Sequence, residues 1–233
     1  MSGKFLGFCC FLCLTCLWGL LGCNQSKERL RGQDALRLGD YSRARQNWST
    51  ILDQNPADAE ARYGLSIAFF SEAQKLDREH RASITQWESA LYEFRILLQI
   101  DSTQTIRAMA STSLFQVARA RYGEELFAQS DVLLDDAIRL DSTNWFAWNL
   151  KGLALEGLGR FDDAQASYEQ ILIRNPDFIS AYVNLGNLHW SQGRIEDAWD
   201  DWSLGLQRDS TNVYLKHWVE RAANKLLEKD SQK

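Results

Sequence analysis

The chain has 233 residues, of which 45% are hydrophobic and 24% are charged, an ordinary composition for a globular protein. It contains only 2 prolines and 14 glycines, too few for the many turns of a sandwich or barrel, so helices are favoured. The net charge of −5 and the lack of a long basic run disfavour nucleic acid as a partner, because that binding needs Lys and Arg against phosphates. Composition therefore argues against disorder over the whole chain and names no substrate.

The chain begins with a hydrophobic segment that has one charge, Lys4, followed by the apolar run 5–21. The run is short for a membrane span, which needs about 20 apolar residues. A positive start, an apolar stretch and small residues at the end are typical of a secretory signal. We therefore expect residues 1–22 to be a signal peptide.

The end of this segment, Leu20-Leu21-Gly22-Cys23, resembles the lipobox of bacterial lipoproteins. In that family the signal is removed and the new N-terminal cysteine, here Cys23, carries acyl chains that hold the protein on a membrane. The resemblance implies a lipidated N-terminus at 23–24 in a bacterial cell envelope. Asn24 follows the cysteine where aspartate would signal inner-membrane retention, which implies the periplasmic face of the outer membrane in a Gram-negative source. A plain secretory signal or a single anchoring helix is the alternative.

A repeat with a period of 34 residues runs through the remaining chain. A small residue lets a first helix approach its partner, a glycine ends that helix, and an alanine allows a second helix to cross it. An aromatic residue then fills the space between neighbouring hairpins. The recurring residues are Gly32, Gly39, Ala44 and Trp48 in one segment, Gly152, Gly159, Ala164 and Tyr168 in another, and Gly186, Gly193, Ala198 and Trp202 in a third.

This pattern resembles the tetratricopeptide repeat, which implies an all-α fold: a right-handed superhelix, or α-solenoid, of about five helical hairpins. A C-terminal capping helix and tail are expected at 213–233, where one face is apolar and the other charged. The second and third repeats are longer and lack the glycine, so the pattern does not define their turns. We expect longer helices in the second repeat, whose charged tip at 77–83 is a further candidate contact. The predicted hairpins are 25–58, 59–104, 105–144, 145–178 and 179–212.

No group of residues in the sequence indicates catalysis, a cofactor or a metal site. The three histidines have no acidic or histidine partner at metal-ligand spacing, and His189 falls at a core position of its repeat. Adjacent acidic residues such as Asp135-Asp136, Asp162-Asp163 and Asp200-Asp201 diverge on a helix, so we expect them on solvated faces. With the signal removed, Cys23 is the only cysteine, which excludes a disulfide framework and a zinc site. We therefore do not expect an enzyme.

The first helix of each repeat lines the inner surface of such a superhelix, and its inward positions predict a groove for a partner segment. The groove is apolar and amide-rich, with Phe146 and Val183 in the same register. Basic residues beside the asparagines are missing, so a clamp for a peptide's terminal carboxylate is not expected. Trp190 either anchors a partner or is covered by the capping helix. The predicted groove residues are Arg29, Gln33, Tyr63, Ile67, Phe70, Asn149, Leu153, Glu156, Asn184, Asn187 and Trp190.

The expected function is that of a lipid-anchored scaffold that binds another envelope protein or a peptide segment of one. The N-terminal lipid is the expected contact with the membrane. A self-associating structural module without a separate client is the alternative. The layout resembles repeat lipoproteins that help to assemble pilus secretins, outer-membrane proteins or cell-wall hydrolase complexes, and only analogy chooses among them.

Overall fold

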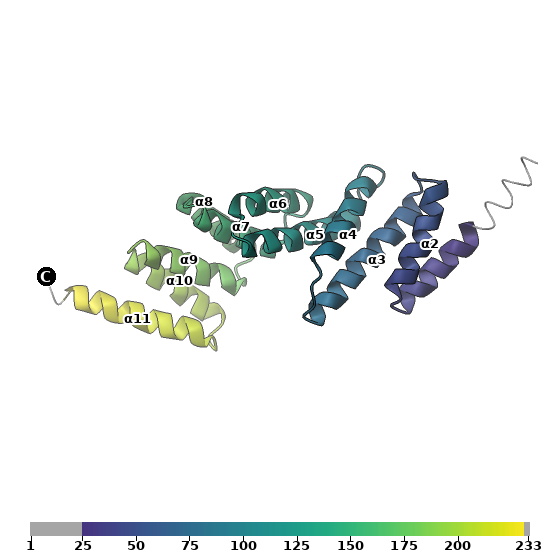
Figure 1. Ribbon diagram of the computed structural model, residues 1–233. Helices are drawn as coiled ribbons and strands as arrows, with labels where there is room; N and C mark the ends of the chain where they lie inside the picture. The colour runs from purple at the N-terminus through teal and green to yellow at the C-terminus, as the bar shows by residue number, and fades with distance from the viewer. Residues whose placement is uncertain (1–24, 231–233) are drawn as a thin grey trace, which may run out of the picture. The chain divides into compact units, whose positions relative to one another are not determined.

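The computed structural model describes residues 25–230, and all regular secondary structure there is α-helical, which confirms the predicted all-α fold (Figure 1). The predicted signal peptide and Cys23 lie outside the described residues. The helices are 25–37, α2 (Tyr41–Gln54), α3 (Ala59–Arg78), α4 (Ile84–Leu97), α5 (Gln104–Gly123), α6 (Phe127–Leu140), α7 (Trp145–Gly157), α8 (Phe161–Arg174), α9 (Ile179–Ser191), α10 (Ile195–Arg208) and α11 (Val213–Asp230).

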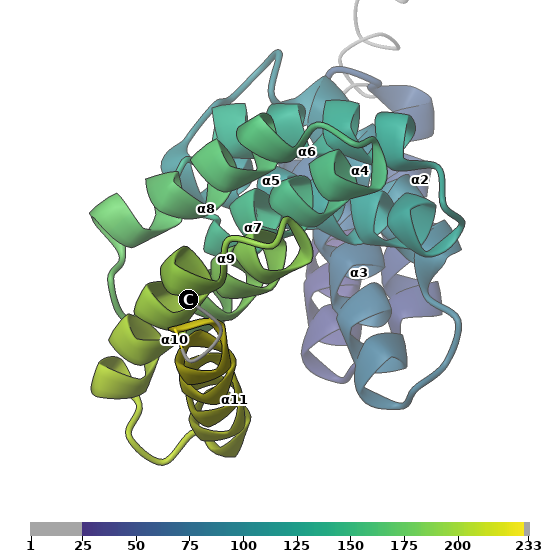
Figure 2. The same ribbon diagram turned by 90° about the vertical axis from the view of Figure 1, so that its left-hand side faces the viewer.

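The chain divides into two compact units, Met1–Ser113 and Leu114–Lys233, and the boundary falls inside α5. In the first unit, α3 packs against both α2 and α4 (Figure 1). In the second unit, α6 to α11 form a continuous series in which each helix packs against the next (Figure 2). Each unit is therefore built from helical hairpins laid side by side, and α11 follows the last hairpin.

The hairpins share one length of second helix and differ in the first. The second helices, α2, α4, α6, α8 and α10, all have 14 residues. Among the first helices, α7 and α9 have 13 residues, whereas α3 and α5 have 20. The longer helices have about two additional turns, so the last residue of each faces the same side of its helix as the last residue of a shorter one would. The expected lengthening in the second repeat is thus confined to α3.

The turns inside the five hairpins share one backbone geometry, although only three of them contain glycine. Gly39, Gly159 and Gly193 have φ of 73°, 72° and 76°, in the left-handed region that glycine adopts without strain. His80 and Glu125 occupy the same place in the two long hairpins, with φ of 53° and 59°. The amide that follows each of them donates to the carbonyl five residues earlier, at 2.9 Å in both turns. The long hairpins therefore close as the glycine hairpins do, with strain at one side chain.

Aromatic residues of the second helices are buried at the junctions, as the pattern predicts. Trp48, Tyr168 and Trp202 are each exposed by 2% or less. Each ring lies against a glycine of the first helix in its own hairpin, where an added Cβ would come closer than 3.0 Å to ring atoms. The small residue and the aromatic residue of the repeat are thus one packing contact. The pairs are Gly32 with Trp48, Gly152 with Tyr168 and Gly186 with Trp202.

Helix α11 in the second unit and helix 25–37 in the first unit each have a polar face. Leu215 and Ala222 of α11 are fully buried in a cluster with Trp202, whereas its other face is exposed and charged, as expected of a capping helix. In the first unit, the buried residues Ala61, Leu65 and Ala68 of α3 correspond by the period of 34 to exposed residues of helix 25–37. Those residues are Lys27, Arg31 and Asp34, so the first hairpin has a polar outer face of its own.

Candidate functional site

The structure corrects the predicted groove at Phe70. This residue is only 8% exposed and packs edge-on against Trp87 and Phe94 of α4, with ring centroids 5.2 and 6.0 Å away. Its place in the repeat is the one that Glu156 and Trp190 occupy in later repeats. All three side chains turn towards the second helix of their own hairpin, because the first helix buries this position against its partner. The position belongs to the core of the hairpin.

Glu156 shows what a polar residue does at that position. It is half-buried, and the Tyr168 hydroxyl donates a hydrogen bond to its Oε1 at 2.5 Å. Burial raises the pKa of Glu156, and the hydrogen bond from Tyr168 only partly offsets this. Burial and the same hydrogen bond also raise the pKa of Tyr168 above its ordinary range. Glu156 is therefore engaged inside the hairpin and is not a groove residue.

The capping helix α11 covers one side of Trp190, as one of the two interpretations of the sequence expected. Its ring lies 5.7 Å from that of Trp202 and 5.5 Å from that of Trp218 on α11. The residue is half-buried, and its remaining surface lines a cavity between α9 and α11. The capping helix thus contacts Trp190 and leaves part of it accessible.

In the first unit, the predicted residues are partly engaged in internal contacts. Arg29 forms ion pairs with Asp58 and with Glu60, the latter at 2.5 Å. Burial acts to raise the pKa of Asp58, but hydrogen bonds from Arg29 and from the Ala61 amide hold it below its ordinary value. Among the other predicted residues of this unit, Gln33 is exposed and Ile67 is half-buried. Tyr63 is 38% exposed and lies beside a cavity of about 410 Å³ at the ends of α3 and α4.

In the second unit, three predicted asparagines lie on one continuous surface. Asn184 Nδ2 on α9 donates to Asn149 Oδ1 on α7 at 2.9 Å. The Tyr214 hydroxyl at the start of α11 donates to Asn187 Oδ1, also at 2.9 Å. These bonds join α7, α9 and α11 through their side chains. We call this set, together with the neighbouring Phe146, the amide surface.

Phe146 is the largest apolar group of the amide surface. It is 64% exposed, and its ring lies 6.3 Å from that of Phe115 and 5.5 Å from that of Phe178. Leu153, the remaining predicted residue here, is half-buried about two turns after Phe146 on α7. The aromatic contacts hold Phe146 in place while most of its surface faces solvent. Phe115 is a contributor that the sequence analysis missed: it lies 34 residues before Asn149, at the same place in the repeat, but the extra residues at the start of α5 concealed that register.

The hydrogen bonds of the amide surface leave a definite set of polar groups for a ligand. Asn184 retains its Oδ1 as an acceptor, while Asn149 and Asn187 retain their Nδ2 groups as donors. A row of donors and acceptors without charge matches the N–H and C=O groups of a peptide backbone. The surface is thus suited to an extended neutral segment with one apolar side chain against Phe146.

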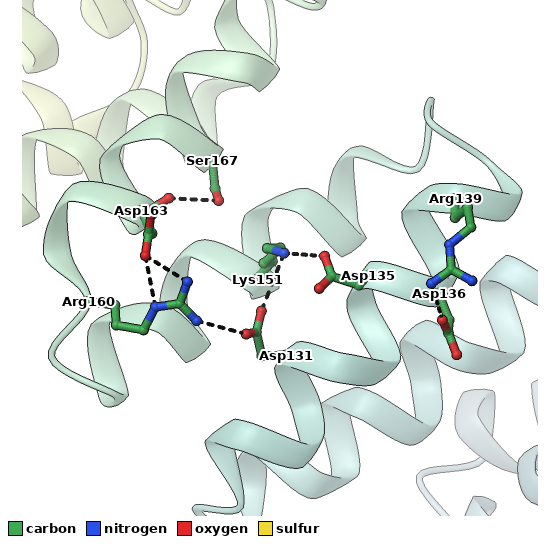
Figure 3. Close-up of polar contacts among 8 residues, drawn as sticks. All are labelled: Asp131, Asp135, Asp136, Arg139, Lys151, Arg160, Asp163 and Ser167. Atoms are coloured by element: carbon green, nitrogen blue, oxygen red, sulfur yellow. Dashed lines mark hydrogen bonds and ion pairs between the residues drawn. The ribbon is translucent and has the colours of Figure 1, made fainter.

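Several acidic residues of α6 and α8 pair with cations, as Figure 3 shows for Asp131, Asp135, Asp136 and Asp163. Asp135 turns to Lys151, whereas its neighbour Asp136 turns to Arg139. Asp131 lies 3.4 Å from Lys151 and 3.3 Å from Arg160, and Arg160 also pairs with Asp163 at 2.7 Å. The network joins α6, α7 and α8. The adjacent carboxylates Asp135 and Asp136 pair with different cations, which agrees with their expected divergence on the helix.

Asp201 differs from this expectation of solvated acidic faces, because it is half-buried against His189. The His189 Nδ1 and Asp201 Oδ2 atoms are 2.6 Å apart, and His189 is 4% exposed, which confirms its core position. Gln165 Nε2 donates to Glu169, so its Oε1 accepts from His189 Nε2 at 3.2 Å. The histidine and aspartate therefore share one proton on the Nδ1 side. Burial raises the pKa of Asp201 to about 7 and lowers that of His189.

Within residues 25–230, no three His, Cys, Asp or Glu side chains converge as metal ligands. Within the same residues, no helix combines the length and apolar character needed to cross a bilayer.

Comparison with known proteins identifies the family. The tetratricopeptide repeat family matches residues 29–94 and 149–210, which together make up more than half of the chain. The chain therefore belongs to the tetratricopeptide repeat family, whose fold is that of a scaffold for protein–protein interactions. The two matched regions contain the repeats with the clearest period, and the gap contains the long α5.

Relatives from three organisms share the repeats over part of their length. The chain is 30% identical over 172 residues to cellulose synthase operon protein C of Xanthomonas axonopodis pv. citri, covering 72% of this chain and 10% of that protein. It is 25% identical to the TPR repeat-containing protein MJ1428 of Methanocaldococcus jannaschii, covering 72% and 28%. It is 25% identical to the STIP1 homolog of Dictyostelium discoideum, covering 49% and 20%. The chain thus spans less than a third of each of these relatives.

Solved structures of similar fold have low sequence identity to the chain. A crystal structure of MamA superposes with a TM-score of 0.57 and 17% identity, covering 81% of this chain and 93% of MamA. A crystal structure of YrrB, described as a TPR protein with an unusual peptide-binding site, gives a TM-score of 0.54 and 16% identity, covering 80% and 87%. At these identities the likeness supports the fold alone.

Proposed function

We propose that this chain is a lipid-anchored adaptor of a bacterial cell envelope, which binds an extended segment of another envelope protein at the amide surface. The observation that carries the proposal is Phe146, which is 64% exposed beside the hydrogen-bonded Asn149 and Asn184. A large aromatic side chain that is held by neighbouring rings and left open to solvent is typical of an anchor in a protein interface. The family's role as an interaction scaffold supports the same class of function.

A peptide segment is the class of ligand that the polar groups favour. The amide surface offers donors and an acceptor but no charge, so it matches a backbone better than a charged chain end. YrrB, which is described as having a peptide-binding site, has a similar fold and supports a peptide ligand by that likeness only. An extended segment would lay backbone groups along the asparagines and one apolar side chain on Phe146.

The membrane anchor is a separate part of the proposal and rests on the residues Leu20-Leu21-Gly22-Cys23. Acylation of Cys23 would place helix 25–37 within a few residues of the bilayer. Metabolic labelling with a palmitate analogue tests this in the native chain and in Cys23→Ala. We expect label on the native chain and none on Cys23→Ala, whereas label retained on the variant would contradict the anchor.

Binding is tested by affinity capture from detergent-solubilised envelope with the native chain and the double variant Phe146→Ala/Asn184→Ala. Loss of one interface anchor typically costs about 2 kcal/mol or more, roughly thirtyfold in affinity, so capture by the variant should fall at least that much. Val132→Ala on α6 is the matched control, because Val132 is 63% exposed outside the amide surface.

The identity of the captured protein separates the two functional interpretations. A protein other than this chain supports the adaptor, and the chain itself supports the alternative of a self-associating module. Equal capture by the native chain and the double variant, with helicity unchanged by circular dichroism, would contradict the amide surface as the binding site.

A further inference from the structure

A cavity of about 420 Å³ lies between the C-terminal end of α9 and one face of α11. This volume is within the range of pockets that hold small ligands or single side chains. Trp190 forms the α9 side, and Arg221 and Asn224 of α11 lie nearly one turn apart on the other side. Within the described residues no further helix covers this face of α11, which is open.

Arg221 is held in a fixed orientation by the two indole rings beside it. Its Cζ lies 4.9 Å from the ring centroid of Trp218 and 5.7 Å from that of Trp190. A guanidinium stacked on an indole keeps its planar N–H edge available for a ligand. Among the described residues, Arg221 has no ion-pair partner, in contrast to Arg194, which pairs with Asp197 at 2.7 Å.

The other charges around the cavity leave Arg221 as its available cation. Lys225 lies 3.9 Å from Glu228, and these two charges largely offset each other. Glu220 also lines the cavity and is exposed, but it forms no ion pair with Arg221. Asn224 is exposed beside Arg221 and offers amide donors. The site thus combines one oriented cation, one amide and an indole wall with the exposed carboxylate of Glu220.

We propose that this cavity binds a carboxylate of a partner polypeptide, with Arg221 as the anion-binding residue and Trp190 against an adjacent apolar side chain. A guanidinium donates two parallel hydrogen bonds to a carboxylate, and Asn224 supplies a further donor. The inference rests on the proposed function in one respect, namely that the ligand is a protein segment. The site lies apart from the asparagines Asn149 and Asn184, where no basic residue supports carboxylate binding.

Short peptides test the site directly and separate the two sources of a carboxylate. The probes are N-acetyl-Leu-Glu-amide, with an acidic side chain, N-acetyl-Leu-Leu, with a free chain end, and N-acetyl-Leu-Gln-amide, which is neutral. The readout is the indole N–H resonances of the ¹⁵N-labelled full chain in detergent, assigned with Trp190→Phe and Trp218→Phe. We expect saturable shifts with at least one acidic probe and at least tenfold weaker binding of the neutral one.

Substitution of Arg221 then assigns the binding to this residue. Arg221→Gln should weaken binding of the acidic probe at least tenfold. Arg221→Lys should bind this probe with an affinity between those of the native chain and Arg221→Gln, because lysine keeps the charge without the planar fork. Arg174→Gln is the matched control, since Arg174 lies 5.8 Å above the ring of Trp148 in another hairpin. It should leave the shifts unchanged.

Two results would overturn the proposal: equal binding of neutral and acidic probes, or equal binding by Arg221→Gln and the native chain. The variant Phe146→Ala/Asn184→Ala should bind the acidic probe normally. If the amide surface does not bind a partner, the peptide measurement still tests the cavity at Arg221. If the peptides do not bind at Arg221, partner capture still tests the amide surface.

Discussion

Gly186 and Trp202 fit together so closely that a side chain on Gly186 has no room, because an added Cβ would lie well under 3.0 Å from indole atoms. The same contact joins Gly152 to Tyr168 in the preceding hairpin. The recurring glycine and the aromatic residue sixteen positions after it therefore form one packing contact. This contact repeats in each hairpin that has both residues. This contact sets how closely the two helices of a hairpin approach.

Replacement of Gly152 by alanine should destabilise the second unit. The added Cβ would overlap the ring of Tyr168, which is fully buried and has no space to move into. Overpacking of this kind typically costs about 1–3 kcal/mol of unfolding free energy. Gly123→Ala is the control, because no atom lies within 4 Å of a Cβ at that helical position and alanine favours helix by about 1 kcal/mol. Urea unfolding followed by circular dichroism measures both, and a Gly152→Ala chain as stable as the native one would contradict the contact.

Glycine at position 125 should stabilise the chain. Glu125 has φ of 59°, a left-handed conformation that costs a residue with a side chain about 1–2 kcal/mol. Glu125→Gly removes that strain but adds freedom to the unfolded chain, so a net gain of about 0.5–1 kcal/mol is expected. Glu124→Gly, at a neighbouring position without positive φ, should instead lower stability. Equal effects of the two substitutions in thermal unfolding would mean that the turn does not have this geometry.

The stability contributed by Glu156 should depend on pH. Burial raises the pKa of this carboxyl in the folded state above that in the unfolded chain, so ionisation opposes folding. The stability that protonated Glu156 contributes is fully present at pH values below the pKa of this group in the unfolded chain. It is lost as the pH rises through the pKa of the group in the folded chain. The glutamine of Glu156→Gln cannot ionise and can still accept the hydrogen bond from Tyr168. At pH 7.5 the substitution should therefore raise the unfolding free energy by on the order of 1 kcal/mol, and the melting temperature with it. At pH 4 the two chains should melt together, and a difference of the same size at both pH values would contradict this account.

A buried ion pair in the first unit should show strong coupling. Arg62 donates to Glu93 at 2.6 Å and to the Pro56 carbonyl at 2.7 Å, and both charged side chains are almost inaccessible. Removal of one partner from such a pair typically costs about 3–5 kcal/mol, because the other charge stays buried without a partner. Arg62→Met should therefore destabilise more than the double variant Arg62→Met/Glu93→Met. Additive effects in urea unfolding would show that the pair is not coupled.

The sequence predicted the hairpins where the glycine and the aromatic residue were both present, since their spacing follows directly from the packing contact. It could not define the turns at His80 and Glu125, because a left-handed residue other than glycine has no distinctive sequence signal. The boundary between the two units inside α5 was also invisible, since that helix is continuous in sequence and in structure.

The candidate site was predictable only in part. The period correctly brought Asn149 and Asn184 to one surface, because residues about one repeat apart lie on neighbouring first helices. It misplaced Phe70 and Glu156, since a regular register does not tell whether a position faces the groove or the second helix. Arg221 lies on α11, beyond the last full repeat, so no repeat position pointed to it.

The most direct test of the account is photo-crosslinking from position 146 of the amide surface in intact cells. The chain would carry benzoylphenylalanine at residue 146, with the same group at the exposed position 132 as the control. The account predicts a crosslink from 146, and none from 132, to one envelope protein of different mass from this chain. It further predicts that Asn184→Ala weakens that crosslink. Crosslinks of equal strength from both positions, or from 146 to this chain alone, would contradict an adaptor that binds its partner at the amide surface.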